Sequence, residues 1–65
     1  MNITVNGNPE EIIPCSIRAF VLGKGLAVEG VVVEHNDRIV KKDEWDVIEL
    51  MENDHLEILS FVGGG

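Results

Sequence analysis

The chain ends in three consecutive glycines, Gly63, Gly64 and Gly65, directly after the apolar segment 56–62. Glycine has no Cβ, so a run of glycines forms a thin strip of backbone that fits a channel too narrow for side chains. We therefore expect the C-terminal carboxylate of Gly65 to be the reactive group, with Gly63 and Gly64 as the spacer that threads it into a partner. The alternative interpretation is a frayed terminus without function.

Such a carboxylate needs activation, because its negative charge and its resonance both oppose nucleophilic attack. Adenylation with ATP is the common biochemical route. The ATP and the magnesium ion would be bound by the activating partner, so we expect this chain to bind no cofactor and no metal. A chain of 65 residues also has little room for a deep catalytic pocket. These considerations favour a protein that is acted upon over an enzyme.

Other reactive residue types show no arrangement typical of a site. Cys15, His35 and His55 lack metal-ligand spacing, and Ser16 is expected to cap a helix rather than to act as a nucleophile. We expect both histidines at the surface, near turns or strand ends, and Cys15 as a small, semi-buried apolar residue. The carboxylates show no partner arrangement that would mark an acid–base pair.

The charge of the chain restricts its partners. The net charge is −7, which argues against binding to nucleic acid or to an anionic membrane surface. Segment 43–57 carries many carboxylates and neither Lys nor Arg. This acidic segment predicts solubility first, and electrostatic steering toward a basic partner surface second. Its carboxylates are Asp43, Glu44, Asp46, Glu49, Glu52, Asp54 and Glu57.

The sequence also predicts a compartment. Cys15 is the single cysteine, so it has no internal disulfide partner, as is usual in a reducing cytosol. Residues 1–4 lack the basic and apolar segments of a signal peptide. No apolar run approaches the ~20 residues needed to span a bilayer. We therefore expect a cytoplasmic protein without a membrane partner.

The first half of the chain predicts a hairpin and a helix. Residues 2–6 alternate polar and apolar side chains, as in a strand, and Gly7 with Asn8 indicates a turn. The return strand would span 10–13, with Pro9 suited to a sheet edge. A short helix should follow the cap Ser16 and should end near the glycines at 23 and 25. Its apolar face would comprise Ile17, Phe20 and Val21.

The second half predicts three further strands. Residues 28–35 indicate a central strand, 36–37 a turn, and 38–40 a short return strand. Asp43 is expected to cap a helical turn that holds Trp45, and 53–54 to form a turn before the last strand, 56–62. The expected fold is α+β, with a mixed, twisted sheet of about four to five strands curled around one short helix. We expect residues 1–62 to form this domain and 63–65 to be a flexible tail.

This pattern resembles a known family. The length, the element order, the opening Ile3-x-Val5-Asn6-Gly7, the segment 33–40 and the final glycines are similar to the ThiS-type sulfur carriers of thiamin biosynthesis, which have the ubiquitin-like β-grasp fold. That family often continues with Val-Pro-Arg, two variable residues and Trp. Here Lys41 and Lys42 replace the Pro and Arg, while Trp45 keeps its spacing.

The resemblance implies a reaction cycle. An E1-like adenylyltransferase (ThiF type) would adenylate Gly65, and a persulfide from a cysteine desulfurase or another donor would supply the sulfur of a thiocarboxylate. Thiazole synthase (ThiG type) would then take that sulfur. The alternatives that remain open are a molybdopterin-synthase small subunit, a ubiquitin-like modifier and a β-grasp binding module that carries nothing.

The last strand predicts a docking surface for these partners. Its alternation places Leu56 and Ile58 on the face covered by the helix, and Leu59 and Phe61 on the opposite face. An exposed apolar pair close to the tail is typical of a partner site. The alternative is that a bend of the sheet buries both side chains locally.

Overall fold

The computed structural model of the chain describes residues 1–61. The predictions for Val62, Gly63, Gly64 and Gly65, and for the boundary between domain and tail, lie outside the described residues. The elements follow in the order β1 (Asn2–Val5), β2 (Asn8–Glu11), α1 (Ile17–Gly23), the 3₁₀ turn η1 (Val28–Gly30), β3 (Val31–His35), β4 (Arg38–Val40), the 3₁₀ turn η2 (Lys42–Glu44) and β5 (His55–Ser60).

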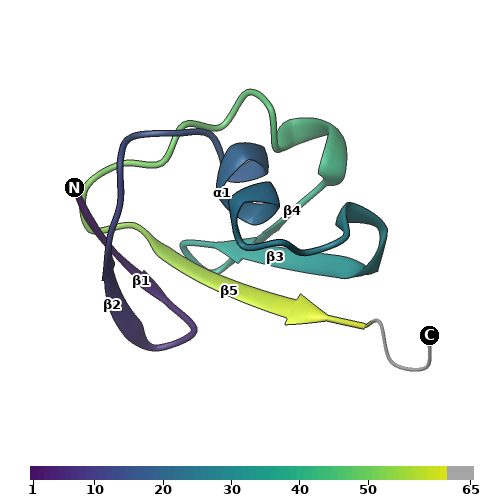
Figure 1. Cartoon of the computed structure of the whole chain (residues 1–65), viewed down its shortest axis with the longest axis horizontal. Helices are drawn as coiled ribbons and strands as arrows, with labels where there is room; N and C mark the ends of the chain where they lie inside the picture. Colours follow the sequence, from purple (N-terminus) through teal and green to yellow (C-terminus); the bar gives the residue numbers. More distant parts are fainter. Residues whose placement is uncertain (62–65) are drawn as a thin grey trace.

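The strands form one five-stranded sheet in the order β2-β1-β5-β3-β4. β1 and β5 run parallel, and the other neighbouring pairs are antiparallel. Helix α1 lies across one face of this sheet, and the opposite face has no helix over it (Figure 1). The predicted α+β fold, a mixed sheet around one short helix, is therefore confirmed. No helix within residues 1–61 is long and apolar enough to cross a membrane.

The first hairpin turns one residue earlier than predicted. Asn6 and Gly7 both have positive φ angles, of 50° and 84°, and Val5 pairs with Asn8. A two-residue hairpin turn of this type needs positive φ at both central positions, and Asn and Gly adopt it most readily. The predicted edge position of Pro9 is confirmed, since it lies on the outer strand β2.

Helix α1 forms as predicted. The Ser16 hydroxyl accepts a hydrogen bond from the Ala19 N–H at 3.1 Å, which satisfies one of the first N–H groups of the helix. Ile17, Phe20 and Val21 are buried against the sheet. The seven-residue helix therefore adds one apolar face to the core.

Three element boundaries in the second half differ from the prediction. Residues 28–30 form the 3₁₀ turn η1 and not the start of a strand. The last hydrogen bond between this segment and the end of the chain is the one that the Gly30 C=O accepts from the Phe61 N–H at 2.6 Å, and the pairing stops there. Asp43 lies inside η2 rather than capping it, and the Glu44 carboxylate accepts the Lys41 N–H at 3.0 Å instead. β5 begins at His55 and, within the described residues, ends at Ser60.

The core lies between α1 and the sheet. Trp45 follows η2 and is completely buried; its indole N–H donates to the Val40 C=O at 3.4 Å, so the polar atom of this large side chain keeps a partner. The core residues are Ile3, Ile17, Phe20, Val21, Val31, Val33, Val40, Trp45, Leu50, Leu56 and Ile58.

Two leucines of β5 provide a matched test of this packing. Leu56 is 0% exposed and Leu59 is 52% exposed. Leu56→Ala should lower the free energy of unfolding by about 2–5 kcal/mol, because it removes core contacts and leaves a cavity. Leu59→Ala should change it by no more than about 0.5 kcal/mol. Urea unfolding followed by circular dichroism is the measurement, and equal losses in the two variants would contradict the described orientation of β5.

Candidate functional site

The strand that leads into the glycines is held by β1 at its start and by β3 along most of its length. β5 lies in the interior of the sheet, between β1 and β3, and points toward the C-terminus (Figure 1). On the β1 edge, the Thr4 N–H donates to the Asp54 C=O at 2.9 Å and the Asn6 N–H to the Leu56 C=O at 2.8 Å. On the β3 edge, β5 is paired from Leu56 to Ser60. Hydrogen bonds to the neighbouring strands therefore fix the position of β5, the strand that precedes the glycines.

The side chain of Asn6 extends the β1 edge by one position. β1 ends at Val5, and beyond it the Asn6 side-chain oxygen accepts the Ile58 N–H at 2.7 Å, while its NH₂ group donates to the Ile58 C=O at 3.3 Å. One amide side chain thus replaces the backbone of a strand. The sequence analysis treated Asn6 only as part of the opening motif and did not predict that its side chain binds Ile58. The position of Asn6 directly before the glycine of a hairpin turn was the one sequence feature that could have indicated it.

Leu59 and Phe61 are exposed on the uncovered face of the sheet, by 52% and 66%. Val32 lies directly opposite Leu59 in the β3–β5 register and is half-buried. Ile39 of β4, 68% exposed, pairs with Glu34, two residues along β3 from Val32, on the same face. The predicted exposure of Leu59 and Phe61 is therefore confirmed. We call Val32, Ile39, Leu59 and Phe61 the sheet-face patch.

Carboxylates border the sheet-face patch. Glu34 and Glu57 lie opposite each other on β3 and β5, at the end of the patch away from the tail. An apolar area with charged neighbours at its rim is the usual composition of a partner-binding surface. Whether Leu59 and Phe61 contact a partner stays a prediction.

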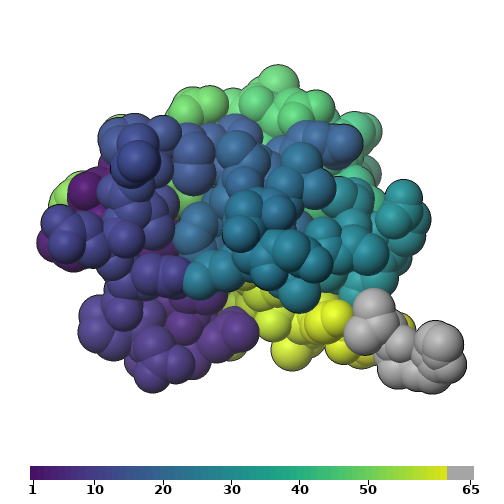
Figure 2. Space-filling model, viewed as in Figure 1, coloured from purple at the N-terminus to yellow at the C-terminus, as the bar shows by residue number. Residues whose placement is uncertain are grey.

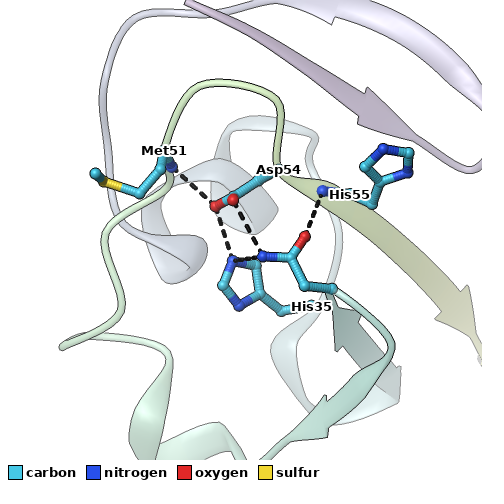
Figure 3. A network of polar contacts seen from close by, with 5 residues as sticks. His35, Met51, Asp54 and His55 are labelled. Carbon is cyan, nitrogen blue, oxygen red and sulfur yellow. Dashed lines mark hydrogen bonds and ion pairs between the residues drawn. The ribbon is translucent and has the colours of Figure 1, made fainter.

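One carboxylate of the acidic segment 43–57, that of Asp54, is buried and does not contribute to the exposed acidic surface. Asp54 is only 7% exposed and faces inward. Its Oδ2 lies 2.8 Å from His35 Nε2 and accepts the Met51 N–H at 2.8 Å. Its Oδ1 accepts a hydrogen bond from the Asn36 side chain at 3.1 Å, and the Asn36 side-chain oxygen accepts the His55 N–H at 2.8 Å (Figure 3).

This network corrects one prediction. His35 was expected at the surface, but its side chain is only 17% exposed because it packs against Asp54; His55 is exposed, as expected. Asp54 has three hydrogen-bond partners, which the sequence analysis did not predict. The network joins the β3–β4 turn to the start of β5, which indicates a structural role. It was missed because His35 and Asp54 are 19 residues apart in the sequence.

The contacts of Asp54 change its acidity. Burial alone raises the pKa of the Asp54 carboxyl, but the hydrogen bonds from His35, the Met51 N–H and Asn36, together with the charge of His35, outweigh burial and hold that pKa below its usual value. The ionised form is therefore favoured in the folded state. Its hydrogen bonds stabilise the fold wherever Asp54 is ionised.

Cys15 has the character that the sequence predicted. It is half-buried, and burial together with the nearby Glu49 carboxylate raises the pKa of its thiol. A thiol with a raised pKa forms little thiolate, which is the nucleophilic species. Cys15 is therefore packed as a small apolar residue. Within residues 1–61, no three His, Cys, Asp or Glu side chains are close enough together to hold a metal ion.

The Asp54 network predicts an acid-dependent loss of stability. Because the pKa of Asp54 is lower in the folded than in the unfolded chain, its contribution is complete above the unfolded pKa of about 3.9 and is lost as the pH falls through the folded value. Asp54→Asn should cost about 1–3 kcal/mol at pH 7. The variant should then lose less further stability than the wild type as the pH falls from about 5 to about 2.

Urea unfolding at pH 7, 5, 3 and 2 measures both parts of this prediction. Glu52→Gln is the control, since Glu52 is an exposed carboxylate of the same acidic segment that accepts only the Asn2 N–H, at 3.2 Å. Its pH profile should follow the wild type closely. Parallel profiles for wild type and Asp54→Asn would show that Asp54 contributes nothing to acid stability.

The fold and the fixed strand before the glycines define a class. A five-stranded mixed sheet around one helix, with the C-terminal strand in its interior, is the ubiquitin-like β-grasp arrangement. The chain belongs to the ThiS family, whose model matches residues 3–65 and so includes the three glycines. The resemblance found in the sequence is thereby confirmed.

Solved structures agree with this assignment. The crystal structure of the thiamine biosynthesis protein ThiS from Geobacter metallireducens is similar over 100% of both chains, with a TM-score of 0.85 and 30% sequence identity. The solution structure of a thiamine biosynthesis protein from the same organism also gives a TM-score of 0.85 and 30% identity, and the match covers 88% of that chain.

Two curated relatives match the sequence. A thiazole synthase of Magnetococcus marinus is 33% identical over 66 residues, which cover 100% of this chain and 20% of that protein. The sulfur carrier protein ThiS of Bacillus subtilis is 46% identical over 35 residues, 54% of this chain. The matched part therefore spans one fifth of the first relative and about half, 53%, of the second.

Proposed function

We propose that the chain is a sulfur carrier for thiazole formation in thiamin biosynthesis, and that Gly65 is its acyl site. The observation that carries this proposal is the family match through residue 65, in a chain whose last strand is a fixed base for the glycines. The carrier is a protein co-substrate and not itself an enzyme. The Geobacter thiamine biosynthesis protein and the Bacillus sulfur carrier protein, to which the chain is similar, support the assignment.

The proposed cycle has three chemical steps. A carboxylate oxygen of Gly65 attacks the α-phosphate of ATP on the adenylyltransferase, and pyrophosphate leaves. A persulfide from a cysteine desulfurase or another donor attacks the acyl-adenylate carbon, and AMP leaves with the bonding electron pair. A thiol then attacks the donor's sulfur in the resulting acyl disulfide, the S–S bond breaks, and the thiocarboxylate leaves while the thiol and the donor form a mixed disulfide. In this cycle the adenylyltransferase binds ATP and Mg²⁺.

Thiazole synthase is the proposed acceptor of the sulfur. The Magnetococcus protein named thiazole synthase contains a stretch similar to this whole chain. One polypeptide thus joins a carrier-like segment to that enzyme, which supports a partnership between the two. The adenylyltransferase and the sulfur donor are proposed from the chemistry of the carboxylate. The single half-buried Cys15 supports a cytoplasmic site for the cycle.

The acyl site is tested by intact mass. After incubation with ATP, the adenylyltransferase of the same genome, a cysteine desulfurase and a thiol, the chain should gain the mass difference of one oxygen replaced by one sulfur. Deletion of Gly65 should abolish the gain, because the carboxylate then lies one residue too close to β5. Circular dichroism is the folding control. A deletion variant that still gains the sulfur would exclude Gly65 as the acyl site.

The spacer is tested by Gly64→Val. A side chain at this position should clash inside the channel of the adenylyltransferase, while the free energy of unfolding stays within about 0.5 kcal/mol of the wild type. Gly64→Ala, with a smaller side chain, should retain more activity than Gly64→Val. Pyrophosphate release on addition of the carrier is the measurement. Equal rates for wild type and Gly64→Val would show that the channel is wide enough for side chains.

The sheet-face patch is the proposed docking surface for both enzymes, since both act on the same carboxylate. Leu59→Ala and Phe61→Ala should each weaken both complexes by about 1–3 kcal/mol, as interface anchors do. Leu22→Ala is the matched control, because Leu22 is 50% exposed on α1, on the other side of the molecule. Higher salt should mainly slow association, because it screens the acidic segment.

Isothermal titration of each variant against each enzyme decides the matter. Leu22→Ala should bind like the wild type. If folded Leu59→Ala and Phe61→Ala also bind both enzymes like the wild type, the docking surface lies elsewhere on the chain.

A further inference from the structure

The register of β5 shows which of its backbone groups face away from β3. In an antiparallel pair, hydrogen-bonded and non-hydrogen-bonded residue pairs alternate. The Phe61 N–H donates to the Gly30 C=O and the Asn36 N–H donates to the His55 C=O, so the pairs that contain Phe61 and His55 are hydrogen-bonded ones. Ser60, which pairs with Val31, therefore belongs to a non-hydrogen-bonded pair. Its N–H and C=O point to the other edge of β5.

That other edge is unoccupied beside Ser60. β1 pairs with β5 only at His55 and Leu56, and the Asn6 side chain occupies the next position, Ile58. Within residues 1–61, nothing accepts from the Ser60 N–H or donates to its C=O along this edge. Ser60 is also exposed. A strand edge with unpaired backbone groups is a template for another extended segment.

A hollow lies next to this edge. It has a volume of about 380 Å³, and most of its lining surface is apolar. Figure 2 shows β5 exposed beside the turn of the first hairpin. The lining residues are Val5, Asn6, Lys24, Leu26, Ile58 and Ser60.

We propose that this edge docks a short extended segment of thiazole synthase, which adds to the sheet beside β5 through the Ser60 N–H and C=O. The inference rests on the proposed carrier function. An enzyme that acts on Gly65 lies within a few residues of Ser60, because only four residues follow Phe61. Thiazole synthase is the chosen occupant because the Magnetococcus protein of that name contains a stretch similar to this whole chain. Strand addition supplies affinity through main-chain hydrogen bonds, and side-chain pockets supply specificity.

The hollow indicates the chemistry of the added segment. The Lys24 ammonium group is paired with Glu10, and its nitrogen lies 5.2 Å from the centre of the Phe20 ring, so this charge already has partners within the chain. Val5, Leu26 and Ile58 form the apolar part of the lining. The added segment therefore places an apolar side chain into the hollow and its main chain along Ser60. This contact is separate from the sheet-face patch, because Ile58 and Ser60 alternate with Leu59 along β5.

Amide hydrogen exchange tests the main-chain contact without any mutation. In the free carrier, the Ser60 N–H should exchange much faster than the Ile58 N–H, which donates to Asn6. Addition of saturating thiazole synthase from the same genome should slow exchange at Ser60 at least tenfold more than at Ile58. Unchanged relative exchange at Ser60 in the complex would overturn the proposal. Concentration-dependent protection of Ser60 in the carrier alone would identify a second copy as the occupant and would also overturn it.

A matched pair of variants tests the same contact by affinity. Ser60→Pro removes the N–H, which the fold does not use, at a strand edge where proline is tolerated; it should weaken binding to thiazole synthase about tenfold, as the loss of one main-chain hydrogen bond predicts. Ser60→Ala keeps the N–H and should bind within about twofold of the wild type. Wild-type affinity of a folded Ser60→Pro, or an equal loss in Ser60→Ala, overturns the proposal. If Ser60→Pro does not fold, the exchange measurement decides.

The mass assay separates this inference from the proposed function. A chain that gains sulfur while Ser60 stays unprotected in the complex is a carrier without strand addition, which overturns the docking proposal alone. A chain that protects Ser60 on binding but gains no sulfur keeps the docking and loses the carrier function.

Discussion

The parallel pairing of β5 with β1 is the contact on which the rest of the structure depends. It joins the two ends of the described chain and completes the order β2-β1-β5-β3-β4. With β5 in place, Leu56 and Ile58 lie beside Ile3 and beneath α1. In a 65-residue chain the core is small, so losing one interior strand would remove a large part of the buried apolar area.

Polar side chains form hydrogen bonds at both ends of the β1–β5 pairing. Asp54 collects hydrogen bonds from His35, Asn36 and Met51 just before the strand begins, and Asn6 holds Ile58 near its end. Buried polar groups are tolerated only when they are hydrogen-bonded, and no buried side-chain nitrogen or oxygen within residues 1–61 lacks a partner. The strand that leads to the glycines is thus fixed in position and direction.

The two faces of β5 and its β1 edge serve different purposes. Its covered face belongs to the core, its uncovered face carries Leu59 and Phe61, and, within residues 1–61, its β1 edge is open beside Ser60. This division suits the proposed cycle, in which two enzymes act in turn on the same carboxylate. The sheet-face patch and the Ser60 edge lie next to each other without sharing side chains, so one enzyme could use an additional contact that the other does not need.

The sequence by itself determined the element order, the helix with its Ser16 cap, the edge position of Pro9 and the alternation that exposes Leu59 and Phe61. These features depend on local periodicity and on the backbone preferences of single residues. Only the tertiary structure decided that Asp54 turns inward to His35, that Asn6 takes the place of a strand, and that Ser60 keeps an open edge. Asp54 and His35 are 19 residues apart in the sequence, and Asn6 and Ile58 are 52 residues apart. The edge beside Ser60 is open because β1 ends at Val5. No local sequence pattern encodes where a distant strand ends.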